Sequence, residues 1–187
     1  TAIRQMTAEA LGVDIAIVDV RHPDTGESND TGAVSASRMT FMVGHALREA
    51  ASLALEQWRS EERPVKIVHK YVAPPTTPPD PVTGLCDPMV AYAYTAEAIE
   101  IEVDMETGQT RLLDVVCANE IGKMVNPLQV EGQLQGCLIQ VMGYALMEKF
   151  IEKDGMVLTP NFSTYLIPTV LDLPEKVRIK VLENPDP

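Results

Sequence analysis

The stretch L-Q-G-C-L-I-Q-V-M-G-Y-A-L, residues 134–146, places one glutamine, Gln140, inside an apolar run that is punctuated by glycine. Because an α-helix advances about 100° per residue, one quadrant of its surface carries a stripe made of Gly132, Gly136, Gln140 and Gly143. Each glycine costs a helix about 0.5–1 kcal/mol relative to alanine, and a buried amide without partners costs about 1–3 kcal/mol. The stripe therefore predicts a close approach, either of a neighbouring helix whose main chain bonds Gln140 or of a polar cofactor. Spacing alone favours the packed helix pair.

The composition indicates a globular chain and excludes two classes of partner. Of the 187 residues, 45% are hydrophobic and 22% are charged, as in ordinary globular proteins. The net charge of -12 disfavours binding to nucleic-acid phosphates. No apolar run has the length of a membrane span, and no signal segment opens the sequence. We therefore expect a cytoplasmic protein that binds neither nucleic acid nor membrane.

The cysteines and histidines do not form a metal-binding pattern. Cys86, Cys117 and Cys137 lie far apart, which indicates reduced thiols. The histidines are equally scattered, at positions 22, 45 and 69, without the spacing that zinc sites use. We expect no metal ligated by side chains of this chain, so any metal would arrive bound to another group. Cys117 and Cys137 lie in apolar patterns and are predicted to be small core residues.

The first ninety residues predict helices, strands and one long loop. The expected elements are a helix over 2–11 ended by Gly12, a strand over 15–20, a loop over 22–35, a helix over 39–58 capped by Ser37, and a strand over 65–72. The small residues of the second helix indicate that it packs closely and is largely buried.

The second half of the chain predicts a hairpin and the helix that carries Gln140. Residues 73–88 hold six prolines, which exclude a regular helix or a central strand. The expected elements are a hairpin of 99–103 with 109–117, a helix that Asn126 and Pro127 begin and that continues to about residue 150, and a strand over 177–182. These elements indicate an α+β fold of long buried helices on a mixed, mainly antiparallel sheet. Residues 1–187 are expected to form one segment, which could comprise two small α+β lobes meeting near residues 73–92.

A second unusual feature precedes the helix over 39–58. The sequence G-A-V-S-A-S-R, residues 32–38, enters its N-terminus. Exposed amides, the helix dipole and the hydroxyls of Ser35 and Ser37 could together hold a phosphate or another acceptor-rich group. The alternative is a simple N-cap with a flexible approach, and the local sequence favours that alternative.

Eight blocks of the sequence, taken in order, resemble one family. They are R-Q-M-T-A-E-A-L-G-V (4–13), S-A-S-R-M-T (35–40), G-H-A-L-R-E-A-A (44–51), I-E-V-D-M-E-T-G (101–108), N-E-I-G-K-M-V-N-P (119–127), V-E-G-Q (130–133), Q-V-M-G-Y-A-L (140–146), and F-S-T-Y-L-I-P-T (162–169) with D-L-P-E (172–175). They resemble the molybdenum-cofactor-binding large subunit of the xanthine dehydrogenase and aldehyde oxidase family, and they extend over nearly the whole chain.

The resemblance implies roles for both unusual features. In this family a pterin dithiolene, as molybdopterin or its cytosine dinucleotide, carries the molybdenum, and the protein supplies hydrogen bonds but no side-chain metal ligand. The family segment that binds the pterin matches Ser35, Ala36, Ser37 and Arg38. Gln140 matches a family glutamine near the metal, where its amide can donate a hydrogen bond to an oxygen ligand of that metal. The loop 119–126 matches another wall of the cofactor site.

The resemblance also implies a reaction and a set of partners. The family hydroxylates an electron-poor carbon of a nitrogen heterocycle or an aldehyde, with water as the oxygen source, and passes electrons through iron-sulfur clusters to FAD. Its general base is a glutamate in a G-x-G-E segment after the strand that matches 177–182, whereas this chain reads E-N-P-D-P over residues 183–187. Glu175 and Glu183 lie outside such a motif, so no catalytic residue is assigned and the chain alone is expected to be inactive. The expected partners are the remaining part of the molybdenum subunit, iron-sulfur and flavin subunits or domains, and a small-molecule substrate, within an oligomer.

Two other functions stay open at this point. The first is a non-catalytic structural or subunit-interaction domain that keeps the same fold without the cofactor, which the missing glutamate motivates. The second is an unrelated thiol enzyme that uses Cys117 or Cys137 as its nucleophile, although both residues lie in apolar surroundings.

Overall fold

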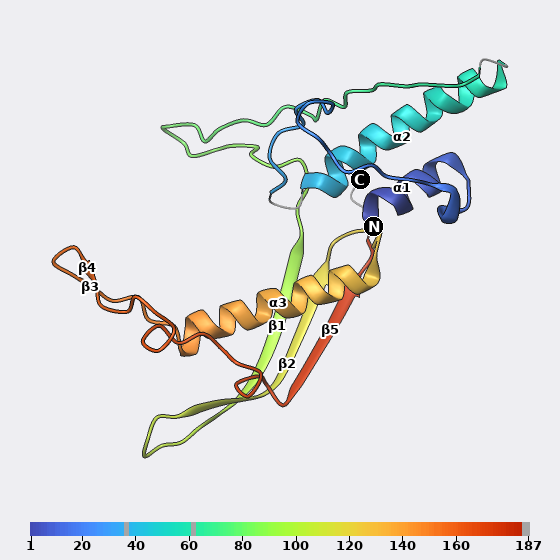
Figure 1. Cartoon of the computed structure of the whole chain (residues 1–187). Helices are drawn as coiled ribbons and strands as arrows, with labels where there is room; N and C mark the ends of the chain where they lie inside the picture. Colours follow the sequence, from blue (N-terminus) through green and yellow to red (C-terminus); the bar gives the residue numbers. More distant parts are fainter. Residues whose placement is uncertain (36–37, 61–62, 185–187) are drawn as a thin grey trace. The chain divides into compact units, whose positions relative to one another are not determined.

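The computed structural model describes residues 1–35, 38–60 and 63–184. The chain divides into two compact units, Thr1–Val90 and Ala91–Pro187, which are described separately below (Figure 1). Helices and a mixed sheet confirm the predicted α+β class. None of the helices in the described ranges is both long and apolar enough to cross a membrane.

The first unit is built on two helices that the sequence predicts correctly. Helix α1 (Ala2–Leu11) ends at Gly12, whose φ of 66° is the left-handed conformation that glycine adopts readily. Helix α1 packs on α2 (Arg38–Arg59) where a Cβ added to Gly44 would lie 3.2 Å from Met6 Sδ. The expected burial of α2 is wrong for the residues described, since Ala51 is its only buried residue.

The predicted strand over 15–20 is wrong. Ile15–Ile17 instead forms a short 3-10 helix, η1. The Asp14 carboxylate accepts the Ala16 N–H at 2.7 Å, and the Arg4 guanidinium donates to the carbonyls of Ile15 and Ala16 at 2.9 and 3.2 Å. These local bonds use the backbone groups that a strand ladder would need, so the alternating pattern does not lead to a strand.

The predicted strand over 65–72 is also wrong. Side chains, rather than a backbone ladder, hold this segment to α2. His69 Nε2 lies 2.5 Å from Glu49 Oε2, and the Tyr71 ring stacks on His45 with centroids 4.7 Å apart. As predicted, the proline-rich residues 73–88 form no regular helix or central strand, and an isolated bridge joins Thr77 to Asp87.

The second unit contains the predicted hairpin within a three-stranded sheet. The hairpin consists of β1 (Tyr94–Val103) and β2 (Thr110–Glu120), and the sheet order is β1-β2-β5 with β5 (Lys176–Leu182). Strands β1 and β2 are antiparallel, whereas β2 and β5 are parallel. The turn is stabilised by Asp104, whose carboxylate accepts the N–H groups of Thr107 and Glu106 at 2.8 Å each. These bonds, that of Thr107 foremost, lower the pKa of Asp104.

A small polar network joins two buried residues of β2 to exposed residues of β1. The Cys117 thiol donates to Glu97 Oε1 at 3.2 Å, and Asn119 Nδ2 donates to Cys117 Sγ at 3.0 Å. Thr95 completes the network by donating to Asn119 Oδ1 at 2.9 Å. Burial raises the pKa of the Cys117 thiol, so Cys117 is the small core residue that the sequence predicts. The same prediction is wrong for Cys137, which is exposed on α3.

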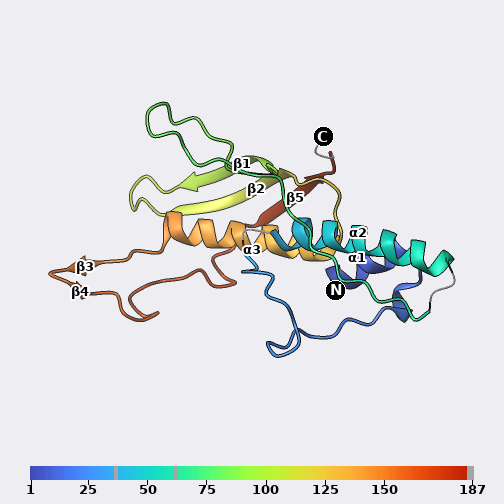
Figure 2. The ribbon, with the colours of Figure 1, turned by 90° about the horizontal axis from the view of Figure 1, so that it is seen from above.

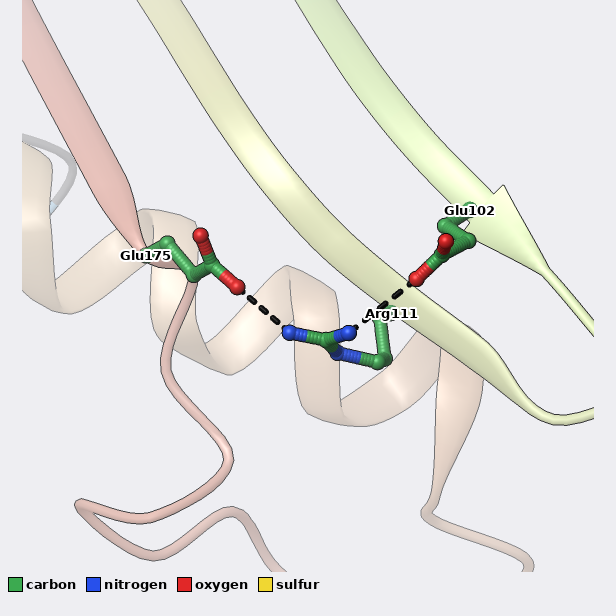
Figure 3. Close-up of polar contacts among 3 residues, drawn as sticks. All are labelled: Glu102, Arg111 and Glu175. Carbon is green, nitrogen blue, oxygen red and sulfur yellow. Dashed lines mark hydrogen bonds and ion pairs between the residues drawn. The ribbon is translucent and has the colours of Figure 1, made fainter.

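Two exposed arginines form ion pairs between neighbouring strands of the sheet. Arg111 on β2 reaches Glu102 on β1 at 3.1 Å and Glu175, next to β5, at 2.5 Å (Figure 3). Arg178 on β5 contacts both carboxylate oxygens of Asp114 on β2, at 3.2 and 2.7 Å. Exposed pairs of this kind contribute about 0.2–1 kcal/mol each, so they favour the observed register more than they hold the fold together.

Helix α3 (Pro127–Leu146) lies across one face of the sheet (Figures 1 and 2). It begins as predicted, because the Asn126 side chain accepts the Gln129 N–H at 3.0 Å and Pro127 occupies the first turn. The helix ends earlier than the predicted residue 150, because the Gly143 carbonyl accepts the N–H groups of both Met147 and Glu148. A small hairpin that the sequence did not predict follows, formed by β3 (Glu152–Lys153) and β4 (Met156–Val157).

Candidate functional site

Two of the predicted site residues lie at the N-terminus of α2. Ser35 and Arg38 are exposed, and the Arg38 backbone N–H donates to the Ser35 carbonyl at 3.1 Å. The Arg38 guanidinium donates to the Ala33 carbonyl at 3.2 Å, beside Gly32 in the left-handed conformation. Ala36 and Ser37, with the predicted cap, lie outside the described residues. Ser35 and Arg38 thus place a hydroxyl and a guanidinium near the positive end of a helix dipole, where anions are stabilised.

The middle of α3 presents an open face around Gln140. The predicted burial of Gln140 is wrong for the described part of the chain: its side chain is exposed and makes no hydrogen bond there. Gly132 and Gly136 lie on the same face, and a Cβ added to either would meet nothing within 4 Å. The tightly packed helix pair that the spacing favoured is therefore not formed within the described residues. The amide is available to a ligand or to another polypeptide.

The C-terminal end of the same stripe is closed. A Cβ at Gly143 would lie 2.5 Å from Pro168 Cδ and 2.5 Å from Glu148 Oε1. The segment around Pro168 therefore crosses α3 at a distance that only glycine allows. The Tyr165 hydroxyl donates to Glu148 Oε2 at 2.6 Å, which raises the pKa of Tyr165. The stripe is thus packed against its own chain at one end and open over the rest.

The loop 121–126 joins β2 to α3, and several hydrogen bonds hold its backbone. Glu120 Oε1 accepts the Gly122 N–H at 2.8 Å, and the Ile121 N–H donates to the Leu182 carbonyl at 3.4 Å. Glu183 Oε1 accepts the Met124 N–H at 2.8 Å. The sequence predicts no role for Glu183, because the parallel pairing of β5 with β2 that brings it to this loop is a property of the fold.

A shallow hollow of about 440 Å³ lies elsewhere in the second unit, and its lining contains no predicted site residue. It is lined by Phe150, Thr159, Pro160, Asn161, Phe162 and Tyr165. In addition, no group of three or more His, Cys, Asp or Glu side chains within residues 1–35, 38–60 and 63–184 could hold a metal ion. The described donors that the sequence predicted are therefore a hydroxyl, a guanidinium and an amide, which suit an acceptor-rich organic group.

Comparison with known protein families gives one match over most of the chain. A family model described as a molybdopterin cofactor-binding domain matches residues 1–63 and 51–174. The chain is 29% identical to an aldehyde oxidoreductase from Megalodesulfovibrio gigas, over 95% of this chain and 21% of that protein. It is also 29% identical to a probable subunit of xanthine dehydrogenase from Bacillus subtilis (strain 168), over 96% of this chain and 28% of that protein.

Solved structures show the same fold at similar identity. The aldehyde oxidoreductase from Desulfovibrio gigas superposes with a TM-score of 0.83 and 26% identity, over 100% of this chain and 22% of that chain. Quinoline 2-oxidoreductase from Pseudomonas putida 86 gives a TM-score of 0.73 and 26% identity, over 100% of this chain and 28% of that chain. The present chain thus spans between about a fifth and three tenths of the length of these relatives.

Proposed function

This chain belongs to the molybdopterin cofactor-binding domain family, as part of the xanthine dehydrogenase and aldehyde oxidase group, and we propose that it binds the molybdenum-pterin cofactor of a hydroxylase. The proposed substrates are nitrogen heterocycles or aldehydes, with water as the source of oxygen. One observation supports this proposal best: the exposed Gln140 amide makes no hydrogen bond within the described residues and lies on a helix face cleared by two glycines.

The described residues fit such a cofactor by their chemistry. A pterin with its phosphate is flat and rich in acceptors, and the glycine face of α3 has room where a Cβ at Gly132 or Gly136 would meet nothing within 4 Å. When bound, the cofactor supplies a metal that takes up the electrons released as the substrate carbon is hydroxylated. The protein needs no metal ligand of its own for this arrangement, because the pterin dithiolene holds the metal.

Each predicted residue has a binding role in this proposal. We propose that Ser35, Ala36, Ser37 and Arg38 bind an acceptor-rich part of the cofactor through hydroxyls, backbone amides and a guanidinium. For Gln140 we propose that its N–H groups donate toward the metal centre without coordinating it and so orient it. The glycines beside Gln140 let the cofactor approach the helix backbone.

The partners follow from the same proposal. Leu128, Val141 and Tyr144 on α3 are 80%, 64% and 79% exposed, which is unusual for large apolar side chains on one helix. We propose that the remaining part of the molybdenum subunit covers them and supplies the general-base glutamate. Iron-sulfur and flavin subunits or domains would receive the electrons, within an oligomeric assembly.

A thiol enzyme that uses Cys117 as its nucleophile is disfavoured by the surroundings of this residue. A nucleophilic thiol needs a lowered pKa and access to substrate, whereas Cys117 is buried and burial raises its pKa. The interaction-domain alternative keeps a specific supporting observation, which is the exposed apolar surface of α3. Cofactor content separates that alternative from the leading proposal.

The first experiment measures cofactor content. The chain is co-produced with the subunits encoded beside it, and the purified assembly is analysed for molybdenum by mass spectrometry and for pterin by fluorescence. We expect both to co-purify with the chain. An assembly that contains neither molybdenum nor pterin, with the chain folded, would reject the proposal in favour of an interaction domain.

The second experiment substitutes Gln140 and a matched glutamine. We expect Gln140→Ala to lower the rate of substrate oxidation by the assembly about 10–100-fold, as losses of outer-shell metal contacts do. Gln135→Ala is the control: Gln135 is exposed on the same helix, about 140° around it from Gln140, and donates to Glu131 at 3.3 Å. The control should keep full activity, and equal rates for both variants would contradict the role of Gln140.

A further inference from the structure

Glu183 is the first residue after β5, and it makes a contact across the end of the sheet that the proposed function does not use. Its Oε1 accepts the backbone N–H of Met124 at 2.8 Å. Met124 lies in the loop 121–126, between the last residue of β2 and the Asn126 cap of α3. The two residues are 59 positions apart in the sequence, so this bond is a long-range tie between separate elements.

The topology explains why Glu183 can reach this loop. Strands β2 and β5 are parallel neighbours, with Glu120 paired to Leu182 at their carboxyl ends. The chain therefore leaves both strands at the same edge of the sheet, where β2 continues into the loop and β5 continues into Glu183. The backbone hydrogen bond from the Ile121 N–H to the Leu182 carbonyl extends this pairing by one residue beyond β2.

The contact has the chemistry of a positioning interaction. A hydrogen bond from a backbone N–H to a carboxylate is charge-assisted and stronger than a neutral one. Glu120 contacts the loop at Gly122, and the Asn126 side chain caps the helix that follows it at Gln129. Gly122 has φ +67°, and a Cβ there would lie 3.7 Å from the carbonyl oxygen of Asn184, the next residue after Glu183. Glu183 thus contacts the part of the loop that lies between Gly122 and Asn126.

We infer that Glu183 is a positioning residue, which holds the loop 121–126 in the conformation that the molybdenum-pterin cofactor requires. The inference rests on the proposed function and on the family resemblance, which implies that the loop 119–126 is another wall of the cofactor site. Glu183 acts through the Met124 backbone and does not touch the reacting atoms. It therefore differs from the general base, which we propose is supplied by the remaining part of the molybdenum subunit.

The first test measures the loop without the cofactor. Hydrogen exchange of the Met124 amide is followed by mass spectrometry in the 187-residue chain and in its Glu183→Ala variant. We expect exchange to become at least about tenfold faster in the variant, as expected for loss of a bond to a charged acceptor. Glu183→Gln keeps an acceptor oxygen and should show a smaller increase. Unchanged exchange in Glu183→Ala would overturn the inference.

The matched control is Glu175→Ala. Glu175 precedes β5 as Glu183 follows it, and its carboxylate pairs with Arg111 at 2.5 Å. This variant removes the same charge from the opposite end of the same strand, and it should leave Met124 exchange unchanged. An equal increase in both glutamate variants would show general loosening of β5 and would overturn the specific role of Glu183.

The second test measures cofactor retention in the assembly. After gel filtration we expect Glu183→Ala to retain molybdenum and pterin about tenfold less well than the wild-type assembly, with Glu183→Gln in between and Glu175→Ala unchanged. Faster Met124 exchange with full cofactor retention would overturn the inference while leaving the proposed function intact. A wild-type assembly without molybdenum would reject the proposed function itself, whatever the exchange experiment shows.

Discussion

The two ends of the glycine stripe on α3 behave in opposite ways. At Gly143 the helix is closed, because Pro168 and Glu148 stand where a Cβ would have to lie. At Gly132 and Gly136 the helix is open, and the neighbouring Gln140 is exposed. Glycine is therefore needed for two different reasons in one helix. At one end it allows a close contact with another segment of this chain, and along the rest it leaves room for another molecule. Substitutions at the two ends of the stripe separate these two reasons.

The largest effect is expected for Gly143→Ala. The added Cβ would lie 2.5 Å from Pro168 Cδ, and overpacking of this kind costs about 1–3 kcal/mol. We expect the free energy of unfolding in urea to fall by that amount. A variant as stable as the wild type would show that the Pro168 segment moves away without a cost in free energy. It would contradict the inference that this end of the stripe needs glycine.

Gly136→Ala is the matched substitution at the open end. Nothing lies within 4 Å of its Cβ position, so the higher helix propensity of alanine should raise stability by about 0.5–1 kcal/mol. The same chemical change thus has opposite signs at two positions seven residues apart on one stripe. Destabilisation by both substitutions would remove the distinction between the ends.

A smaller effect is expected at alkaline pH, again at the closed end. The hydrogen bond to Glu148 raises the pKa of Tyr165 above its ordinary value of 10.0. A group whose pKa is raised on folding contributes stability that is fully present below the unfolded pKa and is lost as pH rises through the folded pKa. We therefore expect the stability difference between the wild type and Tyr165→Phe to shrink as pH rises above about 10.

The ultraviolet absorbance of tyrosinate checks this prediction directly. The difference between the titration curves of the wild type and Tyr165→Phe isolates the one phenol. Its midpoint should lie above 10.0, and a midpoint at or below that value would show that the contact with Glu148 is not formed in solution.

The helices and the hairpin could be predicted because their signals are local. Gly12 ends α1, Asn126 with Pro127 begins α3, and the turn at Asp104 closes the hairpin, each through bonds within a few residues. The two strands that were wrongly predicted failed because the contacts that decide these segments are not local. Residues 15–20 and 65–72 alternate as strands do, but a strand also needs a ladder partner. Arg4 and His69 instead make side-chain contacts that no alternation pattern reveals.

The candidate site could be predicted only in part for a similar reason. The spacing identified the stripe around Gln140 but could not say which of its glycines would be covered, because Pro168 is distant in sequence from Gly143. Glu183 was left unassigned because its contact with Met124 depends on β5 lying parallel to β2. Burial of Gln140 and Cys137 was predicted from their apolar neighbours, whereas both lie on exposed parts of α3.

We propose that the open face of α3 binds the molybdenum-pterin cofactor, and the Gly136→Leu substitution tests this binding. The leucine side chain would fill the clearance beside Gln140 without meeting any described atom within 4 Å of its Cβ. Molybdenum and pterin are measured in the purified assembly, with thermal unfolding as the check on folding. We predict a folded assembly that has lost most of its molybdenum and pterin, whereas a folded Gly136→Leu assembly with wild-type cofactor content would contradict the account.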